Sequence, residues 1–155
     1  VGTLAATNGG TTQYTADDIL VELGTLDTTV PSGFVAATKF FFETFTIGIT
    51  AAMGAVLTGN LAVASATGTA TNVALTNPTE VCGAGVTTFN SQLSNTQSIA
   101  EVDINFNNTA GNYHIFTPYV TAAIARKHLY ARTTTTYDAA DVAGRFTVAA
   151  KYSVY

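Results

Sequence analysis

The C-terminal stretch Arg145–Tyr155 alternates between apolar and polar side chains. Its apolar positions are Phe146, Val148, Ala150, Tyr152 and Val154, separated mainly by polar residues such as Arg145, Thr147, Lys151 and Ser153. Successive side chains of a β-strand point to opposite faces of the sheet. A period of two therefore predicts an extended strand with one buried face and one solvated face. This is the clearest strand in the sequence.

Other stretches are also rich in β-branched or aromatic residues. We predict strands at Ile19–Leu23, Phe34–Thr50, Ile99–Phe106, Tyr113–Val120 (interrupted at Pro118) and Leu129–Tyr137, with a loop and a short strand in Ala51–Ala66. Turn residues separate them at Pro31–Gly33, Asn77–Pro78 and Asn107–Asn112. Tyr119–Arg126 is expected to form one helical turn. About seven to nine short strands with such spacing predict an all-β fold, namely an antiparallel β-sandwich of the jelly-roll type.

The longest predicted strand changes its buried face part of the way along. Phe41, Phe45, Ile47 and Ile49 share one face, and Thr44, Thr46 and Thr50 share the other. Glu43 interrupts the apolar face, whereas Phe40 and Phe42 interrupt the polar one. An extra residue in the ladder exchanges the two faces, so either a β-bulge or a strand that crosses the rim of the sandwich is expected here.

The first thirteen residues are small and polar, with the sequence Asn8-Gly9-Gly10 in their middle. We interpret residues 1–13 as an extended N-terminal arm and residues 14–155 as one β-sandwich domain. Val1–Ala6 lacks the basic region and apolar core of a signal peptide. The sequence leaves open whether a signal peptide or an initiator Met preceded Val1.

Charged residues are scarce and threonine replaces them. Only 10% of the residues are charged, against roughly 25% in average soluble domains, and 29 of the 155 residues are Thr. The net charge of −4 and the mean hydropathy of +0.28 argue against disorder. They also argue against nucleic-acid binding, which needs a concentrated basic face. Glycines and Asn60 interrupt the longest weakly polar stretch, so no transmembrane helix is predicted. Thr at Thr44, Thr46, Thr134 and Thr136 predicts uncharged outer sheet faces, as in a subunit that packs against neighbours.

No catalytic or metal-binding motif is found. His114 and His128 are the only histidines, and no Gly-x-Ser-x-Gly sequence accompanies them. Cys82 is the only cysteine and is interpreted as a small buried hydrophobic residue. Two groups of oxygen-bearing side chains, Asp103/Asn105/Asn107 and Asp17/Asp18/Glu22, offer ligands for calcium, but such strand faces are usually only solvated. We therefore predict a protein that is not an enzyme and has no cofactor and no bound metal.

Partner-binding residues are expected in two places. One is the basic segment Arg126–Arg132, with Arg126, Lys127, Tyr130 and Arg132. The other is the N-terminal arm, with Val1 and Leu4. A solvated loop that leads into a strand is the favoured interpretation of the basic segment. If the segment does bind a partner, a protein is favoured over nucleic acid.

The order of several segments resembles the small β-sandwich or jelly-roll decoration (cement) proteins of tailed-bacteriophage heads. The segments are Tyr14-Thr-Ala-Asp-Asp-Ile-Leu-Val-Glu-Leu-Gly-Thr-Leu, Val30-Pro-Ser-Gly, the Phe-Thr-Ile-Gly-Ile end of the aromatic strand, Leu129-Tyr-Ala-Arg-Thr-Thr and Gly144-Arg-Phe-Thr-Val-Ala-Ala-Lys-Tyr. The resemblance implies a structural protein, often a homotrimer, that binds major capsid proteins on the outer surface of the virion. It carries over no catalytic residue. The arm and the basic segment would then grip an acidic shell.

Two other functions remain open. Thr- and Ala-rich β-sandwiches with low charge also resemble pilus or extracellular filament subunits that assemble by donor-strand addition. The single Cys82 and the weakly apolar arm count against that function. The third function is a carbohydrate-binding or receptor-binding β-sandwich, in which Tyr14, Tyr113, Tyr119, Tyr130 and Tyr137 would stack on sugars.

Overall fold

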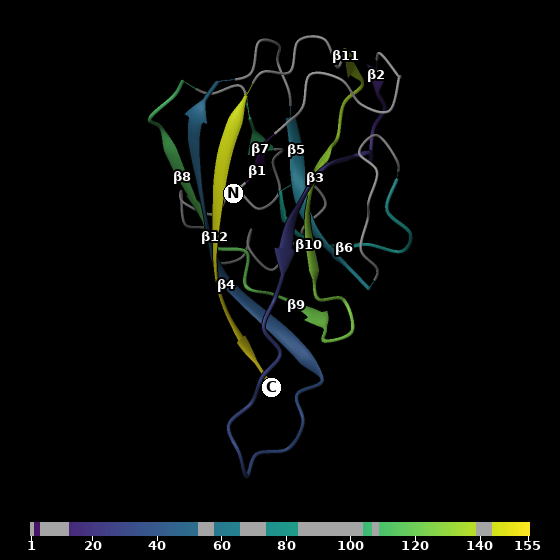
Figure 1. The fold of residues 1–155 in the computed structure, drawn as a ribbon, viewed down its shortest axis with the longest axis vertical. Coiled ribbons are helices and arrows are strands. Elements are labelled where there is room, and N and C mark those ends of the chain that lie inside the picture. The colour runs from purple at the N-terminus through teal and green to yellow at the C-terminus, as the bar shows by residue number, and fades with distance from the viewer. Residues whose placement is uncertain are drawn as a thin grey trace.

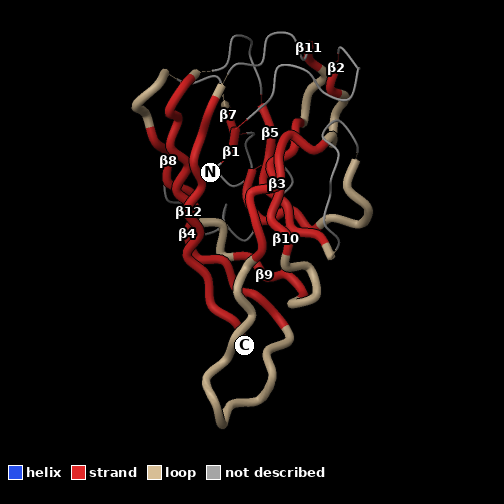
Figure 2. The backbone as a smooth tube through the Cα atoms, in the orientation of Figure 1, coloured by secondary structure: helices blue, strands red, loops and turns tan. Residues whose placement is uncertain are grey.

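The computed structural model describes residues 2–3, 13–52, 58–65, 74–83, 104–106, 109–138 and 144–155. These residues form an all-β fold of two main antiparallel sheets and one short pair of strands (Figure 1). Figure 2 shows strands and connecting loops only, within the ranges described. The predicted all-β class and the antiparallel sandwich architecture are confirmed, whereas the jelly-roll type stays a prediction.

The first sheet has the order β1-β12-β4-β8, with β9 also paired to β4. Its strands are β1 (Gly2–Thr3), β12 (Arg145–Val154), β4 (Lys39–Ala51), β8 (Tyr113–Phe116) and β9 (Val120–Ala123). β12 pairs with β4 along almost its whole length, from Arg145 opposite Ala51 to Val154 opposite Phe40. On the other side of β4, the two short strands β8 and β9 follow one another, and Pro118 lies between them because proline cannot donate to the ladder.

The second sheet has the order β3-β10-β5-β6, with β7 also paired to β5. Its strands are β3 (Ile19–Thr25), β10 (His128–Thr133), β5 (Thr58–Ala64), β6 (Thr79–Gly83) and β7 (Ile104–Asn105). The separate pair joins β2 (Gln13–Tyr14) to β11 (Tyr137–Asp138). Most of the predicted strands are therefore present, and the ranges 66–73 and 84–103 lie outside the described residues.

The hydrophobic core lies between the two sheets. Alternate residues of both layers point into it, and Phe106, which follows β7, meets Phe146 of β12 with ring centroids 4.6 Å apart. The buried residues of this core are Leu20, Phe40, Phe42, Phe45, Ile47, Ile49, Leu61, Val63, Val81, Cys82, Ile104, Phe106, Phe116, Val120, Ala122, Leu129, Ala131 and Phe146. Because both sheets contribute, each layer covers the apolar face of the other.

The bulge predicted in the aromatic strand is present, and Glu43 is the extra residue. Lys151 is opposite Thr44 and the next residue, Tyr152, is opposite Phe42, so Glu43 has no counterpart in β12. The inward residues before the bulge are Phe40 and Phe42, and those after it begin with Phe45. The bulge thus keeps all the large apolar residues inside. The expectation that Phe41 shares the inner face was wrong, because Phe41 precedes the bulge and points outward.

Three further expectations need correction. Phe34 to Thr38 lie in a loop before β4 rather than in the strand. Tyr119–Arg126 does not form a helical turn, since Val120–Ala123 pairs with β4 as β9. Thr134 and Thr136 follow the end of β10 and are not part of a strand face.

The N-terminal arm is only partly described. Gly2 and Thr3 form β1 against Phe146 and Arg145 of β12, and Gln13 belongs to β2. The remaining arm residues, including Val1 and Leu4, lie outside the described residues.

The loop between β3 and β4 projects beyond both sheets, next to the C-terminus at the lower end of Figure 1. A turn closed by the Phe34 amide and the Pro31 carbonyl (3.2 Å) forms its end. Gly33 has φ of +92° there, a value that glycine adopts without strain. The Pro-Ser-Gly turn predicted from the sequence is therefore present.

Candidate interaction surfaces

The outer face of the first sheet carries small, uncharged side chains together with two exposed apolar ones. Thr46 lies between Ile115 and Ala149 in the ladder, and Gly48 lies between Tyr113 and Thr147. Tyr113 is 69% exposed and Ile115 is 50% exposed. Threonine and alanine surround these two side chains. The middle of this outer face is therefore uncharged, whereas the expectation of a wholly uncharged face was wrong, since β4 and β12 carry charged residues at their ends and at the bulge.

The charges on this outer face are paired or peripheral. Glu43 at the bulge and Lys151 on β12 form an ion pair with Oε2 and Nζ 2.6 Å apart. The hydrogen bond to Glu43 and its negative charge raise the pKa of Lys151 above the ordinary value of 10.5. Lys39 and Arg145 lie at opposite ends of the sheet. The middle of the face is therefore neutral.

An aromatic contact lies on the same face, near the end of β4 that pairs with β9. The rings of Phe41 and Tyr119 are stacked with centroids 6.3 Å apart, and Tyr119 is 38% exposed. Tyr119 follows Pro118 and has φ of +50°, an uncommon backbone conformation for a non-glycine residue. The stack places the ring of Tyr119 against that of Phe41, with part of the Tyr119 side chain still exposed.

The outer face of the second sheet contains a buried polar network around Arg132. Its guanidinium lies 2.8 Å from Glu80 Oε1 and 3.7 Å from Asp17 Oδ1, and its Nε donates to Asn60 Oδ1 at 3.0 Å. Asn60 in turn donates to Glu80. Arg132 thereby joins β10 to β5, to β6 and to the turn before β3. The side chain is 4% exposed, so the network acts within the chain.

The basic segment does not form one basic surface. Arg126 donates to the hydroxyl of Thr79, while Lys127 is exposed. Tyr130 is fully buried in a small cluster with Ile19, Ala64 and Leu75. Burial removes Tyr130 and Arg132 from any surface that a partner could contact, which corrects the expectation that both bind a neighbour. It also removes Tyr130 as a platform for a sugar ring.

His128 and its neighbours Glu22 and Thr25 are not arranged as a catalytic triad. Glu22 Oε1 and Thr25 Oγ1 lie 3.1 Å and 3.3 Å from the same ring nitrogen, Nδ1. A triad needs the carboxylate at one ring nitrogen and the hydroxyl at the other. The trio instead joins two neighbouring strands, β10 and β3, which is a structural role.

The other candidate ligands are also separate from one another. Asp18 is buried, and its carboxylate accepts from the amide and hydroxyl of Thr15. Asp103 and Asn107 lie outside the described residues, and Asn105 is exposed. Within the described ranges, no group of three or more His, Cys, Asp or Glu side chains is arranged to hold a metal ion. Cys82 is buried as predicted, and burial raises the pKa of its thiol.

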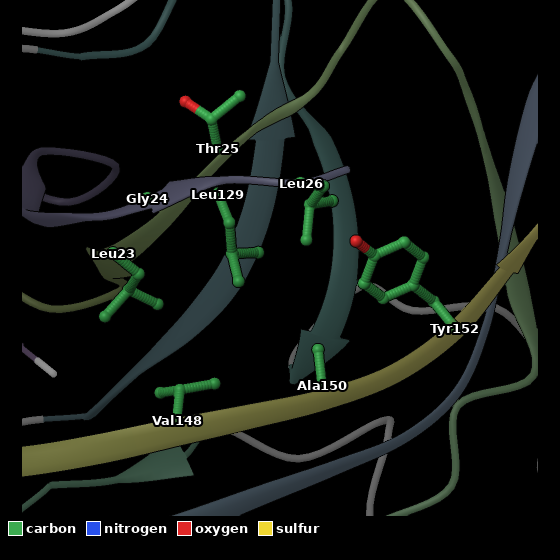
Figure 3. Close-up of a pocket in the computed structure, with 8 residues that line it drawn as sticks. All are labelled: Leu23, Gly24, Thr25, Leu26, Leu129, Val148, Ala150 and Tyr152. Carbon is green, nitrogen blue, oxygen red and sulfur yellow. The ribbon is translucent and has the colours of Figure 1, made fainter. Parts of the chain in front are cut away.

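A groove opens between the sheets at the side where β3 faces β12 (Figure 3). Its volume is about 190 Å³. The floor is the buried Leu129, and the walls are mostly partly exposed apolar side chains. The lining consists of Leu23, Gly24, Thr25, Leu26, Leu129, Val148, Ala150 and Tyr152. None of these eight residues is charged.

Both strands at this groove are edges of their sheets. As far as the structure describes the chain, β3 pairs only with β10, and β12 beyond Phe146 pairs only with β4. The sequence did not reveal the groove, because its walls come from residues more than a hundred positions apart. The alternation of Val148, Ala150 and Tyr152 predicted only that these side chains share a face.

The projecting loop ends in an apolar tip, formed by Phe34 and Val35. Phe34 is 72% exposed and Val35 is 91% exposed. The loop is held at its base by hydrogen bonds from Leu26 N to Lys127 O (2.8 Å) and from Thr38 N to Tyr155 O (2.8 Å). The sequence pattern does not indicate this tip, because the apolar residues Phe34 and Val35 run directly into the aromatic strand that follows.

Within the described part of the chain, no helix is long and apolar enough to cross a membrane. Comparison with models of protein families, with curated protein sequences and with solved structures finds no match to this chain.

Proposed function

We propose that this chain is a non-enzymatic structural subunit that binds protein neighbours through the outer face of its first sheet. The observation that carries the proposal is the neutral middle of this face, where exposed Tyr113 and Ile115 stand among Thr and Ala residues. Tyrosine is enriched where protein surfaces bind one another, and charged residues are depleted at the centres of such interfaces.

A partner can cover the middle of this face with little desolvation of charge. Lys39 and Arg145 lie at the ends of the sheet, and the residues around Tyr113 and Ile115 are uncharged. Short Thr and Ala side chains also lose little conformational entropy when they become fixed. The apolar area of Tyr113 and Ile115 then contributes a favourable term that is not offset by large desolvation penalties.

The specific form that we propose is a capsid decoration protein of a tailed bacteriophage. In this form the partners are the major capsid protein and further copies of the chain, arranged as a homotrimer on the outer surface of the virion. The resemblance of the sequence supports this form, and the β-sandwich architecture is compatible with it. The net charge of −4 gives no support to a role in nucleic-acid binding.

The most informative experiment is electron microscopy of the native particle, labelled with an antibody against this chain. Label distributed over the outside of an icosahedral head supports the proposal. Label along a filament favours the pilus-type subunit instead, and label on neither kind of particle contradicts an assembly role.

A variant test then locates the binding face. We expect the double variant Tyr113→Ser/Ile115→Ser to bind isolated particles at least about tenfold more weakly than the unmodified chain, since two anchors of the interface are lost. Thr136→Ser is the control, because Thr136 is exposed, is not part of the first sheet and lies outside the basic segment. Equal binding by the double variant and the control would contradict the proposed face. If glycan binding disappears while particle binding persists, the face is a carbohydrate site.

Deletion of residues 1–13 remains a test of the arm. We expect the sandwich to fold and the attachment to weaken, although the deletion also removes β1 from the edge of β12. Unchanged binding would contradict a role for the arm, and loss of polymerisation would favour donor-strand assembly.

A further inference from the structure

We infer that the groove between β3 and β12 receives the apolar tip of a second copy of this chain. The inference deepens the proposed assembly function, since it names the surface through which copies contact one another. It rests on two features of one molecule: an open groove whose lining residues are uncharged and mainly aliphatic, and an apolar tip that is exposed.

The tip is not accommodated by its own chain. Phe34 and Val35 are among the most exposed large apolar residues that the structure describes. The loop that carries them projects away from the sandwich (Figure 2). Large apolar side chains gathered at one projecting point are typical of an interaction site rather than of an ordinary solvated loop.

The base of the loop prevents the tip from folding back onto its own groove. The hydroxyl of Tyr152 accepts a hydrogen bond from Asp27 N at 2.8 Å and lies 3.3 Å from Asp27 O. On the other strand of the loop, Thr38 N and Lys39 N both donate to Tyr155 O. Each end of the loop is therefore attached to the C-terminal part of the chain, and only a tip from another molecule is free to enter the groove.

The groove matches the tip in chemistry and in size. Leu23, Leu26, Val148 and Ala150 supply partly exposed apolar walls, as Figure 3 shows, around the buried Leu129. A volume of about 190 Å³ has room for an aromatic ring. Neither the groove lining nor residues 30–37 of the loop contain a charged side chain. Docking therefore buries apolar area and removes no charged side chain of the groove or the tip from water. This holds even though each copy has a net charge of −4.

The contact is heterologous, because the tip of one copy and the groove of the next are different surfaces. Repetition of such a contact closes a ring if the rotation between copies permits and otherwise produces an open chain. The same contact is thus compatible with a cyclic homotrimer and with a filament. Electron microscopy of the native particle distinguishes the two.

Disulfide trapping tests the contact directly. We expect a chain with Val35→Cys, mixed with a differently tagged chain with Thr25→Cys, to form a heterodimeric disulfide under mild oxidation. The native Cys82 is buried and does not compete. A mixture of Val35→Cys with Asn112→Cys is the matched control, because Asn112 is also exposed and lies in the turn before β8. Equal trapping in the two mixtures, or none in either, would overturn the inference.

Two alanine-to-phenylalanine substitutions give an independent test. Ala150 lines the groove, whereas Ala74 is exposed and lies outside both the groove and the first sheet. We expect Ala150→Phe to fill the groove and to weaken self-association, measured by analytical ultracentrifugation, at least about tenfold. The control Ala74→Phe should leave self-association unchanged. Phe34→Ser/Val35→Ser changes only exposed loop residues and should weaken self-association equally. Even weak specific association is detectable at about 1 mM. A wild-type chain that stays monomeric at this concentration would contradict the docking.

The outcomes remain separate from those of the proposed function. Loss of self-association in the tip variant, with particle binding by single copies retained, supports the docking and the outer face independently. If Tyr113→Ser/Ile115→Ser abolishes self-association and the tip variant does not, the copies contact one another through the outer face and the docking is wrong.

Discussion

The guanidinium of Arg132 lies 2.8 Å from Glu80 Oε1, although the Arg132 side chain is only 4% exposed. Asn60 contacts both groups, so β10, β5 and β6 are joined on the outer face of the second sheet. A buried cation is tolerated only when its donors have acceptors, since an isolated charge in the interior is very costly. Arg132 is therefore a structural residue of the second sheet.

Removal of Glu80 should destabilise the protein. In Glu80→Ala the buried guanidinium keeps Asn60 and the more distant Asp17, and we expect the free energy of unfolding to fall by about 2 kcal/mol. This value is below that for a fully buried pair because Glu80 is 31% exposed. Urea denaturation measures it. Glu43→Ala is the control and should change the midpoint little, because its partner Lys151 is 73% exposed and returns to water, whereas Arg132 cannot. Equal effects would contradict the assignment.

Gly59 should not tolerate a side chain. A Cβ atom at this position would lie 2.0 Å from the Arg132 carbonyl oxygen and 2.8 Å from Phe106 Cε2. The carbonyl belongs to the neighbouring strand β10, so relief of the clash would disturb the pairing of β5 with β10. We expect Gly59→Ala to lower the free energy of unfolding by about 3 kcal/mol or more.

Gly48→Ala is the matched control for that substitution. Its added Cβ would meet only the hydroxyl of Thr147 on the outer face, at 3.0 Å. A side chain can rotate away, so the expected loss is less than about 1 kcal/mol. A larger loss for Gly48→Ala than for Gly59→Ala in the same denaturation experiment would refute the packing argument.

Tyr152→Phe should loosen the base of the projecting loop. The substitution keeps the ring in the groove wall and removes the hydroxyl that bonds to the backbone of Asp27. We expect amide exchange at Asp27 to accelerate about fivefold, the factor that corresponds to the net contribution of one hydrogen bond. Hydrogen exchange followed by NMR gives the rate. Unchanged exchange at Asp27, with the same exchange elsewhere, would show that the hydroxyl does not hold the loop.

The carboxyl group of Asp27 should titrate at unusually low pH. The Thr29 hydroxyl and the Thr29 amide donate to it, and these bonds lower the pKa of Asp27 below its ordinary value of 3.8. A depressed pKa means that its contribution to stability is present above pH 3.8 and is lost as the pH falls through the lower, folded value. NMR titration should show this, and Thr29→Val should move the pKa part of the way back. A pKa at or above the ordinary value in the unmodified chain would contradict these bonds.

Cys82 should react only when the chain unfolds. Burial raises the pKa of its thiol above the ordinary 9.0, so the thiol stays protonated where a free cysteine is ionised. We expect alkylation at least about a thousandfold slower than that of an exposed cysteine introduced by Asn112→Cys. The sign of the shift also predicts that stability declines as the pH rises above 9.0. Rapid labelling of the folded chain would contradict the burial.

Local patterns were sufficient for several elements. The alternation in Arg145–Tyr155 predicted β12 because a strand between core and solvent needs a period of two. The exchange of faces around Glu43 predicted the bulge, since only an extra residue allows Phe42 and Phe45 to point the same way. Both features are properties of consecutive residues and so are visible in the sequence.

Other features depended on contacts between distant segments. Val120–Ala123 forms a strand because the edge of β4 offers hydrogen-bond partners to its backbone. The local sequence of Tyr119–Arg126 contains no information about that edge. The same limitation explains the projecting tip. β4 begins to pair with β9 and β12 only at Lys39 and Phe40, so Phe34 and Val35 remain outside the sheet.

The sequence by itself determined the class of fold, the turn at Pro31–Gly33 and the uncharged middle of the outer face of the first sheet, because alternation and composition act within each strand. Only the tertiary structure decided which outward residues stay exposed. Tyr130 and Arg132 occupy the same kind of position in their strand as Tyr113 and Ile115 do in theirs, yet Ile19, Leu75 and the partners of Arg132 cover the first pair and leave the second in solvent. Exposure depends on which distant segments return to cover a face, and period-two alternation contains no information about that.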